Sequence, residues 1–377
     1  MHDLYACIAL RCRHHATEVE TQDILGVQSF VIQKSGEAEF RHPFEEAIYG
    51  SAYSSSRISW PEIKCYQMPM AMLAGEEGAV YIGENRRLSS SSSVWSSVDR
   101  KIRRPISILS SFHNGPLIHL IGKNHDNRAH FLLEHLPRYF ATLKTRKIKD
   151  AKVLVASRFI KWQSDFLELL GENTENLVEV SFGTIRTHNL FFTPFLATNG
   201  QYCDPKIFQE MISQMQRSIS SKVRGQTIQS TSKQSRVLWI SRRDAPDRQI
   251  NNEEALVEIV RHILGQVEVV YLSSLPFHAQ ISKIQNSDII IGAQGQGIAN
   301  AVFVRGKIVI ILDQGTISES NGSWGEKFRD MAEMSGNLAF RLFSGSSAKS
   351  STSNWNFPEI GLSVALKQLK NGSFTNI

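Results

Sequence analysis

The chain has 377 residues, of which 42 are basic and 36 acidic, so its formal net charge is +6. This length exceeds one ordinary domain and suits two, and the 41% apolar content is typical of a globular protein with a large core. No apolar stretch approaches the roughly 20 residues that a membrane-spanning helix needs. The mild positive charge suits anionic small molecules, an anionic membrane surface or nucleic acid equally, so it selects none of them.

The N-terminus and the cysteines favour a cytoplasmic location. The short apolar run at residues 4–10 has no basic stretch before it and is followed at once by charge, which disfavours a secretory signal. The four cysteines are scattered and form no C-x-x-C pair, so neither a zinc knuckle nor a disulfide framework is indicated. We therefore expect a reducing, cytoplasmic setting.

Residues 1–120 are predicted to form a β-rich N-terminal segment that packs on an acceptor-side domain. Short β-like runs broken by turns occupy it, and a run of five serines at 89–93 is expected to be an exposed loop. The runs lie at residues 27–32, 64–68, 79–82 and 116–121.

Residues 121–217 are predicted to form an acceptor-side α/β domain. Apolar spacing predicts helices over 127–145 and 160–170, and apolar runs predict strands at 152–155 and 188–192. The stretch that follows, residues 218–235, is rich in Ser, Gln and Lys and is predicted to be a linker between domains.

Residues 236–343 are predicted to form a second α/β domain, in which continuous apolar strands alternate with helices. That alternation is typical of a parallel sheet covered on both faces. The expected strands are 236–240, 267–272, 288–291 and 307–312, and the expected helices are 252–264, 276–285 and 324–334. Residues 344–377 are expected to hold a Ser-rich loop and a last helix over 360–369.

A glycine-rich turn, Gly292-Ala293-Gln294-Gly295-Gln296-Gly297, joins a predicted strand to a predicted helix. Gly295 and Gly297 allow backbone N–H groups to approach an anion, and a helix N-terminus favours negative charge. The order G-x-x-G-x-G is neither the dinucleotide fingerprint nor a P-loop, so NAD and ATP are disfavoured. We expect a phosphorylated ligand here; the alternative is a tight strand–helix turn that binds nothing.

Polar residues follow two other predicted strands at the same edge of the sheet, where open α/β sheets bind ligands. Arg242 and Arg243 come directly after the first strand and suit bidentate binding of phosphate, with Arg248 supporting the loop. The alternative is a surface salt-bridge cluster with Asp244. Asp313 is expected either to accept hydrogen bonds from a ribose or sugar hydroxyl or to act as a helix cap.

A third cluster lies on the predicted helix 127–145. His130 and Glu134 are four residues apart and share a helical face, which fits a general base whose tautomer the carboxylate fixes. The alternative is a buried hydrogen bond that positions the helix. Arg138 would extend the row, although Pro137 is expected to distort the helix. The H-x-x-x-E-H spacing is not that of a zinc protease, and no metal ligand set is expected.

Three segments in order resemble glycosyltransferase family 61, which includes capsular-polysaccharide-biosynthesis proteins and plant and animal xylosyl- and N-acetylglucosaminyl-transferases. Residues 127–138 are similar to the family's N-x-x-H-[FW]-L-x-E-x-L-P-R segment, and residues 240–252 to its I-S-R-x-x-A-x-x-R-x-I-x-N segment. Gln280 followed by residues 288–300 is similar to the segment ending in G-x-H-G-A-G-L-x-N. The resemblance covers roughly residues 115–342.

The resemblance implies an α/β, GT-B-like architecture, with two Rossmann-like domains facing a cleft and the β-rich segment at the N-terminus. It implies an inverting, metal-independent sugar transfer from a nucleotide sugar to a hydroxyl of a glycan or other acceptor, without a cofactor. His130 and Glu134 would be catalytic, and Asn127 and Arg138 would lie on the acceptor side. The donor-binding residues would be Arg242, Arg243, Gln280, Gln294, Gly295, Gln296, Gly297, Asn300 and Asp313.

Gln294 and Gln296 stand where the family usually has His and Ala. Glutamine can donate a hydrogen bond but cannot ionise, and this motivates an alternative, a non-catalytic sugar- or nucleotide-binding protein of the same fold. A nucleotide-dependent oxidoreductase is a further alternative, disfavoured by the glycine order. Nucleic acid is not expected as a partner, because basic residues interleaved with aromatics are lacking. A role in cell-surface polysaccharide synthesis and peripheral membrane association follow from the family alone.

Overall fold

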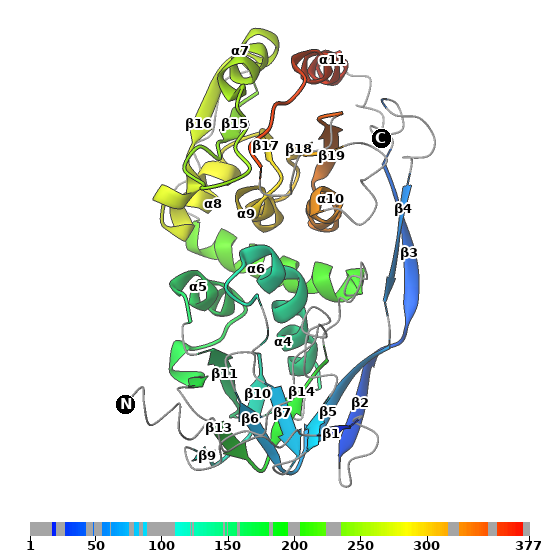
Figure 1. Cartoon of the computed structure of the whole chain (residues 1–377), viewed down its shortest axis with the longest axis vertical. Helices are drawn as coiled ribbons and strands as arrows, with labels where there is room; N and C mark the ends of the chain where they lie inside the picture. The colour runs from blue at the N-terminus through cyan, green and yellow to red at the C-terminus, as the bar shows by residue number, and fades with distance from the viewer. Residues whose placement is uncertain are drawn as a thin grey trace. The chain divides into compact units, whose positions relative to one another are not determined.

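The structure is a computed structural model, and the chain forms two compact units (Figure 1). Unit 1 comprises Met1–Glu37 and Ser59–Met211, and unit 2 comprises Ala38–Ile58 and Ile212–Ile377. The residues that the structure describes are 17–19, 27–42, 48, 55–60, 62–74, 79–82, 86–88, 110–120, 122, 124–145, 148, 150–156, 159–180, 184–194, 204–223, 235–315, 324–345 and 353–371.

The first sheet of unit 1 has a parallel centre and an antiparallel edge. Its order is β12-β11-β10-β14-β5-β2; the first four strands run parallel, and β5 and β2 are each antiparallel to their neighbour. The strands are β2 (Gln28–Gln33), β5 (Ile63–Met68), β10 (Leu117–His119), β11 (Lys152–Ala156), β12 (Leu177–Val180) and β14 (Leu190–Phe192). Strand β11 is a continuous apolar run because it is central and buried from its second residue on.

A second, mixed sheet covers the first one. Its order is β1-β8-β7-β6-β13-β9, and Leu73, Val80 and Ile185 from it share one apolar core with Leu117 and Leu154 of the first sheet. The strands are β1 (Thr17–Val19), β6 (Ala71–Ala74), β7 (Ala79–Ile82), β8 (Arg86–Leu88), β9 (Ser110–His113) and β13 (Thr184–Thr187). Two more strands, β3 (Gly36–Arg41) and β4 (Ser55–Trp60), form a separate two-stranded sheet.

The helix predicted over 127–145 is confirmed, with an irregularity at its centre. It consists of α3 (Arg128–His130), a π-helical turn (Phe131–His135) and α4 (Leu136–Leu143). The N–H of Leu136 donates to the carbonyl of Phe131, five residues back. Pro137 has no N–H to donate and therefore disturbs the regular ladder, and the wider π turn directly before it accommodates the disturbance. Unit 1 also contains α5 (Lys161–Leu169).

Unit 2 is built on a five-stranded parallel sheet, as the alternation of strands and helices predicts. Its order is β16-β15-β17-β18-β19, and every pair is parallel. The strands are β15 (Val237–Ile240), β16 (Val267–Val270), β17 (Ile289–Ala293), β18 (Ile308–Asp313) and β19 (Leu338–Phe343). Burial of all four residues of β15, including Trp239, explains its unbroken apolar sequence.

Helices cover both faces of this sheet (Figure 1). On one face α7 (Glu253–Leu264) and α11 (Glu359–Lys370) pack against each other and contribute Leu256, Val260, Leu362 and Leu366 to the core around Trp239. The other face carries α8 (Phe277–Gln285), α9 (Gln296–Ala299) and α10 (Trp324–Met334). Helix α7 ends at Gly265, where the sequence predicts its stop.

Several boundaries differ from the sequence prediction. The stretch 218–235 was predicted to be a linker, but α6 (Pro205–Val223) continues to residue 223; residues 224–234 lie outside the described residues. The hydroxyl of Ser218 donates to the carbonyl of Gln214 and Ile219 is buried, so a polar sequence still makes a packed helix. The strand predicted over 188–192 begins at residue 190, and β9, β12, β13 and β19 were not predicted.

The expected five-part division of the chain also differs from the two units. Residues 1–120 do not form a separate segment, because β2 and β5 extend the same sheet as β10, β11 and β14. Residues 38–58 belong to unit 2, and the C-terminal helix α11 is part of its core. The serine run at 89–93 and most of the Ser-rich stretch 344–353 lie outside the described residues. Within the part of the chain that is described, no helix is long and apolar enough to cross a membrane.

Candidate active site

Arg242 and Arg243 leave the carboxyl end of β15 in different environments. Arg243 is exposed, and its guanidinium pairs with Glu253 at 3.3 Å and with Glu254 at 2.7 Å, at the first turn of α7. Arg242 exposes only 13% of its side chain and lies 3.4 Å from the Asp247 carboxylate. Arg243 therefore fits the salt-bridge alternative, whereas Arg242 is held inside the loop.

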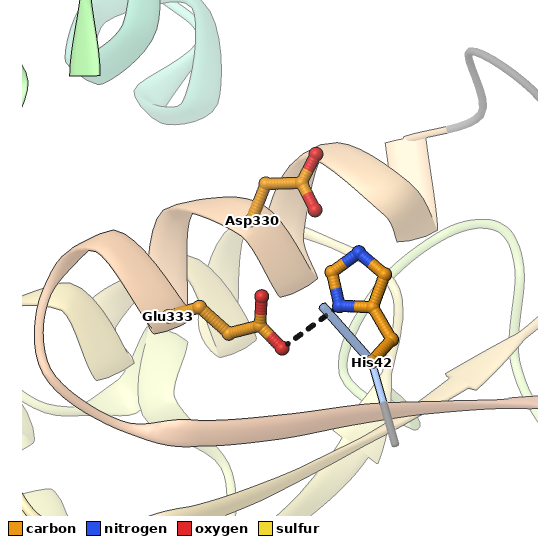
Figure 2. A group of neighbouring side chains, drawn as sticks. All are labelled: His42, Asp330 and Glu333. Carbon is orange, nitrogen blue, oxygen red and sulfur yellow. Dashed lines mark hydrogen bonds and ion pairs between the residues drawn. The ribbon is translucent and has the colours of Figure 1, made fainter. Parts of the chain in front are cut away.

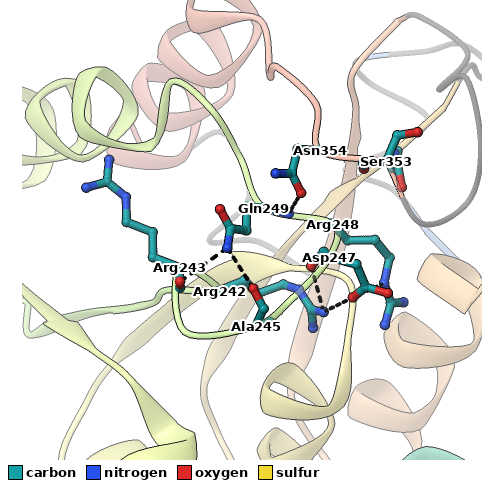
Figure 3. Close-up of polar contacts among 9 residues, drawn as sticks. Arg242, Arg243, Ala245, Asp247, Arg248, Gln249, Ser353 and Asn354 are labelled. Atoms are coloured by element: carbon teal, nitrogen blue, oxygen red, sulfur yellow. Dashed lines mark hydrogen bonds and ion pairs between the residues drawn. The ribbon is translucent and has the colours of Figure 1, made fainter.

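Polar contacts hold the loop that follows Arg242 in one conformation (Figure 3). The side-chain amide of Gln249 donates to the carbonyls of Arg243 at 3.2 Å and Ala245 at 2.6 Å, and its backbone N–H donates to the Asn354 side chain at 3.0 Å. Arg248 adopts a left-handed backbone conformation, with φ of 56°. The loop is consequently tied to residue 354, on the segment that leads into α11.

Asp247 orients the arginines, whereas Asp244 pairs elsewhere. The Asp247 carboxylate lies 3.4 Å from Nη2 of Arg242 and 3.5 Å from Nε of Arg248, so one anion bridges two cations (Figure 3). Asp244 instead accepts a hydrogen bond from Ser273. The sequence contains two aspartates in this loop, three residues apart, and spacing alone does not decide which of them faces Arg242.

The glycine turn at the end of β17 packs directly against this loop. A Cβ added to Gly295 would overlap with Nη1 of Arg242, and one added to Gly297 would lie 3.0 Å from the Ile240 side chain. A Cβ on Gly292 would lie 3.2 Å from both the Ile240 side chain and its carbonyl oxygen. The glycines thus lie at points of close approach, where a larger residue would displace the Arg242 guanidinium or crowd the first strand.

The guanidinium of Arg242 has unused hydrogen-bonding capacity. Its Nε is buried and has no hydrogen-bond partner, and its contacts to Asp247 are long, at 3.3 and 3.4 Å. Burial, followed by the nearby positive charge of Arg248, lowers the pKa of Arg242 from its ordinary value. A buried cation with open donors gains from a bound anion, and a guanidinium suits the oxygens of a phosphate.

The helix after the glycine turn is shorter than the sequence suggests. Helix α9 has four residues and continues as a 3₁₀ turn over Asn300–Phe303. A macrodipole needs aligned peptide units, so its contribution to an anion site is small here and Arg242 is the main positive group. Gln294 is half-buried and donates its N–H to the Leu312 carbonyl at 3.0 Å, while Gln296 is exposed at the turn.

Three residues expected to contact the donor lie inside the fold. Asn300 donates to Gln280 at 2.8 Å, Gln280 donates to the Leu275 carbonyl at 2.8 Å, and both side chains are buried. They join α8 to the segment behind the glycine turn. Asp313 is 2% exposed, and its carboxylate lies against Gly325 in the first turn of α10. Asp313 therefore lies in the interior, next to the start of α10.

His130 and Glu134 form the expected pair in unit 1. Nδ1 of His130 lies 2.8 Å from the Glu134 carboxylate, and the two side chains are 12% and 7% exposed. The Asn127 side chain caps the helix by accepting from the N–H groups of Ala129 at 3.0 Å and His130 at 3.4 Å. The cap and the π turn together fix where the imidazole lies.

Arg138 is in the core of unit 1 and not on an accessible face. It is completely buried, and it donates from Nε to the Thr193 carbonyl at 2.8 Å and from Nη2 to Nδ1 of His119 at 2.9 Å. Burial lowers its pKa to about 9, against the opposing effect of the Glu134 carboxylate. It ties α4 to β10 and to the end of β14, a positioning role.

Comparison with solved structures gives only weak similarities. A flavodoxin of Streptococcus pneumonia TIGR4 is 11% identical, at a TM-score of 0.24, over 38% of this chain and 98% of its own. Flavodoxin 1 of Bacillus cereus is 13% identical, at a TM-score of 0.24, over 37% of this chain and 97% of its own. A short-chain flavodoxin associated with a non-canonical PDU bacterial microcompartment is 12% identical, at a TM-score of 0.25, over 38% of this chain and 97% of its own. Similarities at this level support no inference, and no curated protein matches the chain.

A family comparison is more informative. Residues 129–311 match the family model described as Glycosyltransferase 61. The matched stretch contains the His130–Glu134 pair, Arg242 and the whole glycine turn. This match confirms the family resemblance inferred from the three sequence segments and supports a glycosyltransferase.

Proposed function

We propose that this protein transfers a sugar from a nucleotide-sugar donor to a hydroxyl group of a glycan, with inversion at the anomeric carbon and without a catalytic metal. In this proposal unit 2 binds the donor and unit 1 supplies the general base, in a GT-B arrangement. The observation that carries it is the contact between Arg242 and Gly295 at the carboxyl edge of a parallel sheet. Synthesis of cell-surface polysaccharide in the cytoplasm, with peripheral membrane attachment, is the setting we infer from the family.

The donor diphosphate is proposed to bind at Arg242 and the glycine turn. Arg242 is largely buried, has an unpartnered Nε and shares Asp247 with Arg248, so a phosphate would supply the acceptor oxygens that its donors lack. Negative charge builds up on the departing nucleoside diphosphate as the glycosidic bond to the sugar breaks. A preorganised guanidinium stabilises that charge in the transition state more than in the ground state.

The acceptor hydroxyl is proposed to lose its proton to His130. Pairing of Nδ1 with Glu134 favours the tautomer with hydrogen on Nδ1 and the lone pair on Nε2. The acceptor oxygen attacks the anomeric carbon opposite the leaving diphosphate, its proton moves to Nε2, and the Glu134 carboxylate stabilises the imidazolium that forms. The product is the glycoside of inverted configuration plus a nucleoside diphosphate.

The remaining expected residues receive supporting roles in this proposal. Gln294 and Gln296 donate hydrogen bonds to phosphate or sugar oxygens, which requires no ionisation. Gln280 and Asn300 act by holding the glycine turn, because their amides bond to each other. Asn127 and Arg138 act by positioning the His130 helix, given their capping and core contacts. We therefore expect a larger loss of transfer activity on changing Arg242 than on changing Arg243 or Asp313.

A second candidate function is binding without transfer. Gln294 and Gln296 stand where the family usually has His and Ala, and an amide cannot take up or release a proton as an imidazole does. If the family histidine carries part of the chemistry, a protein with glutamine there would bind a nucleotide sugar and leave it intact. The two candidates differ in turnover and not in binding.

The test is a transfer and hydrolysis assay of the full chain against UDP-, GDP-, CMP- and dTDP-sugars, with a glycan acceptor panel and a thermal-shift measurement on the same samples. We expect that sugars of one nucleotide class support transfer, and that EDTA does not reduce the rate when the assay is run well below the melting temperature. NMR is expected to show a product of inverted anomeric configuration. Stabilisation by a nucleotide sugar without any turnover supports the binding protein. Loss of transfer in EDTA, restored by added Mg²⁺ or Mn²⁺, contradicts the metal-independent mechanism.

A further inference from the structure

Three metal-ligating side chains from distant parts of the sequence meet in unit 2. His42 follows β3, while Asp330 and Glu333 lie one turn apart on α10 (Figure 2). One candidate ligand atom from each lies within 4.8 Å of those of the other two. The residues of the pair His42 and Glu333 are 291 positions apart in the chain, so the cluster joins the strand segment 38–58 to the helix that covers β18 and β19.

The cluster is buried and carries excess negative charge. His42 and Asp330 are 3% and 0% exposed, and the side chain of Glu333 is 15% exposed. Arg329 is the neighbouring cation; it pairs with Asp330 at 2.8 Å and lies 3.7 Å from Glu326. Asp330 and Glu326 thus share this guanidinium, while Glu333 pairs with His42. Buried carboxylates of this kind need a further positive charge.

One oxygen of Asp330 identifies where that charge would lie. Oδ1 accepts both contacts from Arg329, at 3.0 and 2.8 Å, whereas Oδ2 is buried and has no hydrogen-bond partner. Figure 2 shows the Asp330 carboxylate, the His42 ring and the Glu333 carboxylate around one common space. A cation among the three groups would be a partner for each of them, including the buried Oδ2.

The donor set matches a transition-metal site. One imidazole nitrogen with two carboxylates suits Zn²⁺, whose bonds to such ligands measure about 2.0–2.1 Å and place tetrahedral ligands roughly 3.3 Å apart. Nδ1 of His42 lies 3.2 Å from a carboxylate oxygen of Glu333, which is close to the distance expected between two tetrahedral Zn²⁺ ligands. Arg329 orients the Asp330 carboxylate from behind, as outer partners of metal ligands do.

We propose that His42, Asp330 and Glu333 bind one Zn²⁺ ion, which fastens the strand segment 38–58 to α10. Its ligands differ from the groups assigned to sugar transfer, so the ion takes part in no step of that reaction and instead stabilises unit 2. Metal binding requires unprotonated ligands, so affinity falls as the pH is lowered.

The test uses the full chain stripped with EDTA, dialysed and titrated with ZnCl₂, followed by metal analysis, calorimetry and thermal melting. Wild type is expected to bind one equivalent and to melt at a higher temperature with zinc. Asp330→Asn and Glu333→Gln are expected to bind at least about 100-fold more weakly, since even outer-shell changes cost 10–100-fold. Glu258→Gln, the same change at an exposed carboxylate that pairs with Arg261 on α7, is the control and is expected to bind like wild type.

X-ray absorption of the zinc-loaded wild type keeps the test decisive if a variant fails to fold. Nitrogen and oxygen ligands only are expected, because none of the three groups contains sulfur. Sulfur in the coordination shell would assign the ion to cysteines and overturn the proposal. It is equally overturned if wild type retains no zinc, if binding of Mn²⁺ or Mg²⁺ is tighter than binding of Zn²⁺, or if Asp330→Asn and Glu333→Gln bind like Glu258→Gln.

Discussion

The guanidinium of Arg242 lies against the α-carbon of Gly295, so closely that a Cβ on residue 295 would overlap with Nη1. This contact joins the loop after β15 to the turn after β17, two neighbouring strands of the parallel sheet. The glycine and the arginine therefore act as one unit: the first makes room, and the second supplies the charge.

Gly295→Ala is expected to displace Arg242 and to lower kcat/KM for the nucleotide sugar on the order of 10²-fold, as loss of an oxyanion-type donor does. The control is Gly361→Ala on the exposed side of α11, where a Cβ meets only Pro358, at 3.8 Å. That change should stabilise the helix by about 0.5–1 kcal/mol and leave transfer intact. Steady-state kinetics and thermal melts of both variants measure the difference; equal kinetics would contradict the required contact.

His130→Gln is expected to lower kcat by about 10²–10⁴-fold, the usual contribution of a general base, with little change in binding of the donor. Glu134→Gln should give a smaller loss, because it removes the partner of Nδ1 and leaves the ring in place. Glu258→Gln, which removes an exposed carboxylate paired with Arg261, serves as the control. Initial rates under saturating donor test this, and a His130→Gln enzyme with the wild-type kcat would exclude the assigned base.

Arg138→Met is expected to destabilise the protein by about 3 kcal/mol or more, since the buried guanidinium makes hydrogen bonds to Thr193 and His119 that are charge-assisted. Lys161→Met replaces a cation that is 85% exposed and should change stability little. Urea unfolding measures both free energies. If Arg138→Met matched Lys161→Met in stability but lost activity selectively, Arg138 would contact the acceptor after all.

The thiol of Cys65 is expected to resist alkylation in the folded protein. It is completely buried, and burial raises its pKa to about 11, so little of the reactive thiolate forms below that pH. Iodoacetamide at pH 8, followed by peptide mapping, should label Cys65 only after unfolding in urea. Labelling of the native protein at the rate of a free thiol would show that this part of the core opens.

The sequence predicts unit 2 well because its signals are local. Continuous apolar strands, helix stops such as Gly265 and the glycine turn each depend on neighbouring residues. The helix α6 is harder to predict, because its C-terminal half is rich in serine, and its packing is revealed by buried apolar side chains such as Phe208, Met211 and Ile219. Short strands such as β13 pair with partners more than 70 residues away, and such pairing leaves little trace in local sequence.

The candidate site shows the same contrast between features that local sequence predicts and features that depend on distant residues. The His130–Glu134 pair is predictable from helical spacing, and the arginine from its position after β15. That Asp247 orients Arg242, or that Gln280 and Asn300 bond to each other, depends on how loops fold. His42 meets Asp330 and Glu333 only in the folded unit 2, and their spacing along the chain does not reveal this.

The most direct test of the mechanism is the rate of sugar transfer by Arg242→Ala and Arg242→Glu with the preferred nucleotide sugar, beside Arg261→Ala as the control. Arg261 is an exposed cation on α7 that pairs with Glu258, and its loss should leave the rate unchanged. Both Arg242 variants are expected to lose about 10²–10³-fold in rate at a temperature at which circular dichroism shows them to be folded. A rate above about a tenth of wild type in Arg242→Glu would contradict a phosphate-binding role for Arg242.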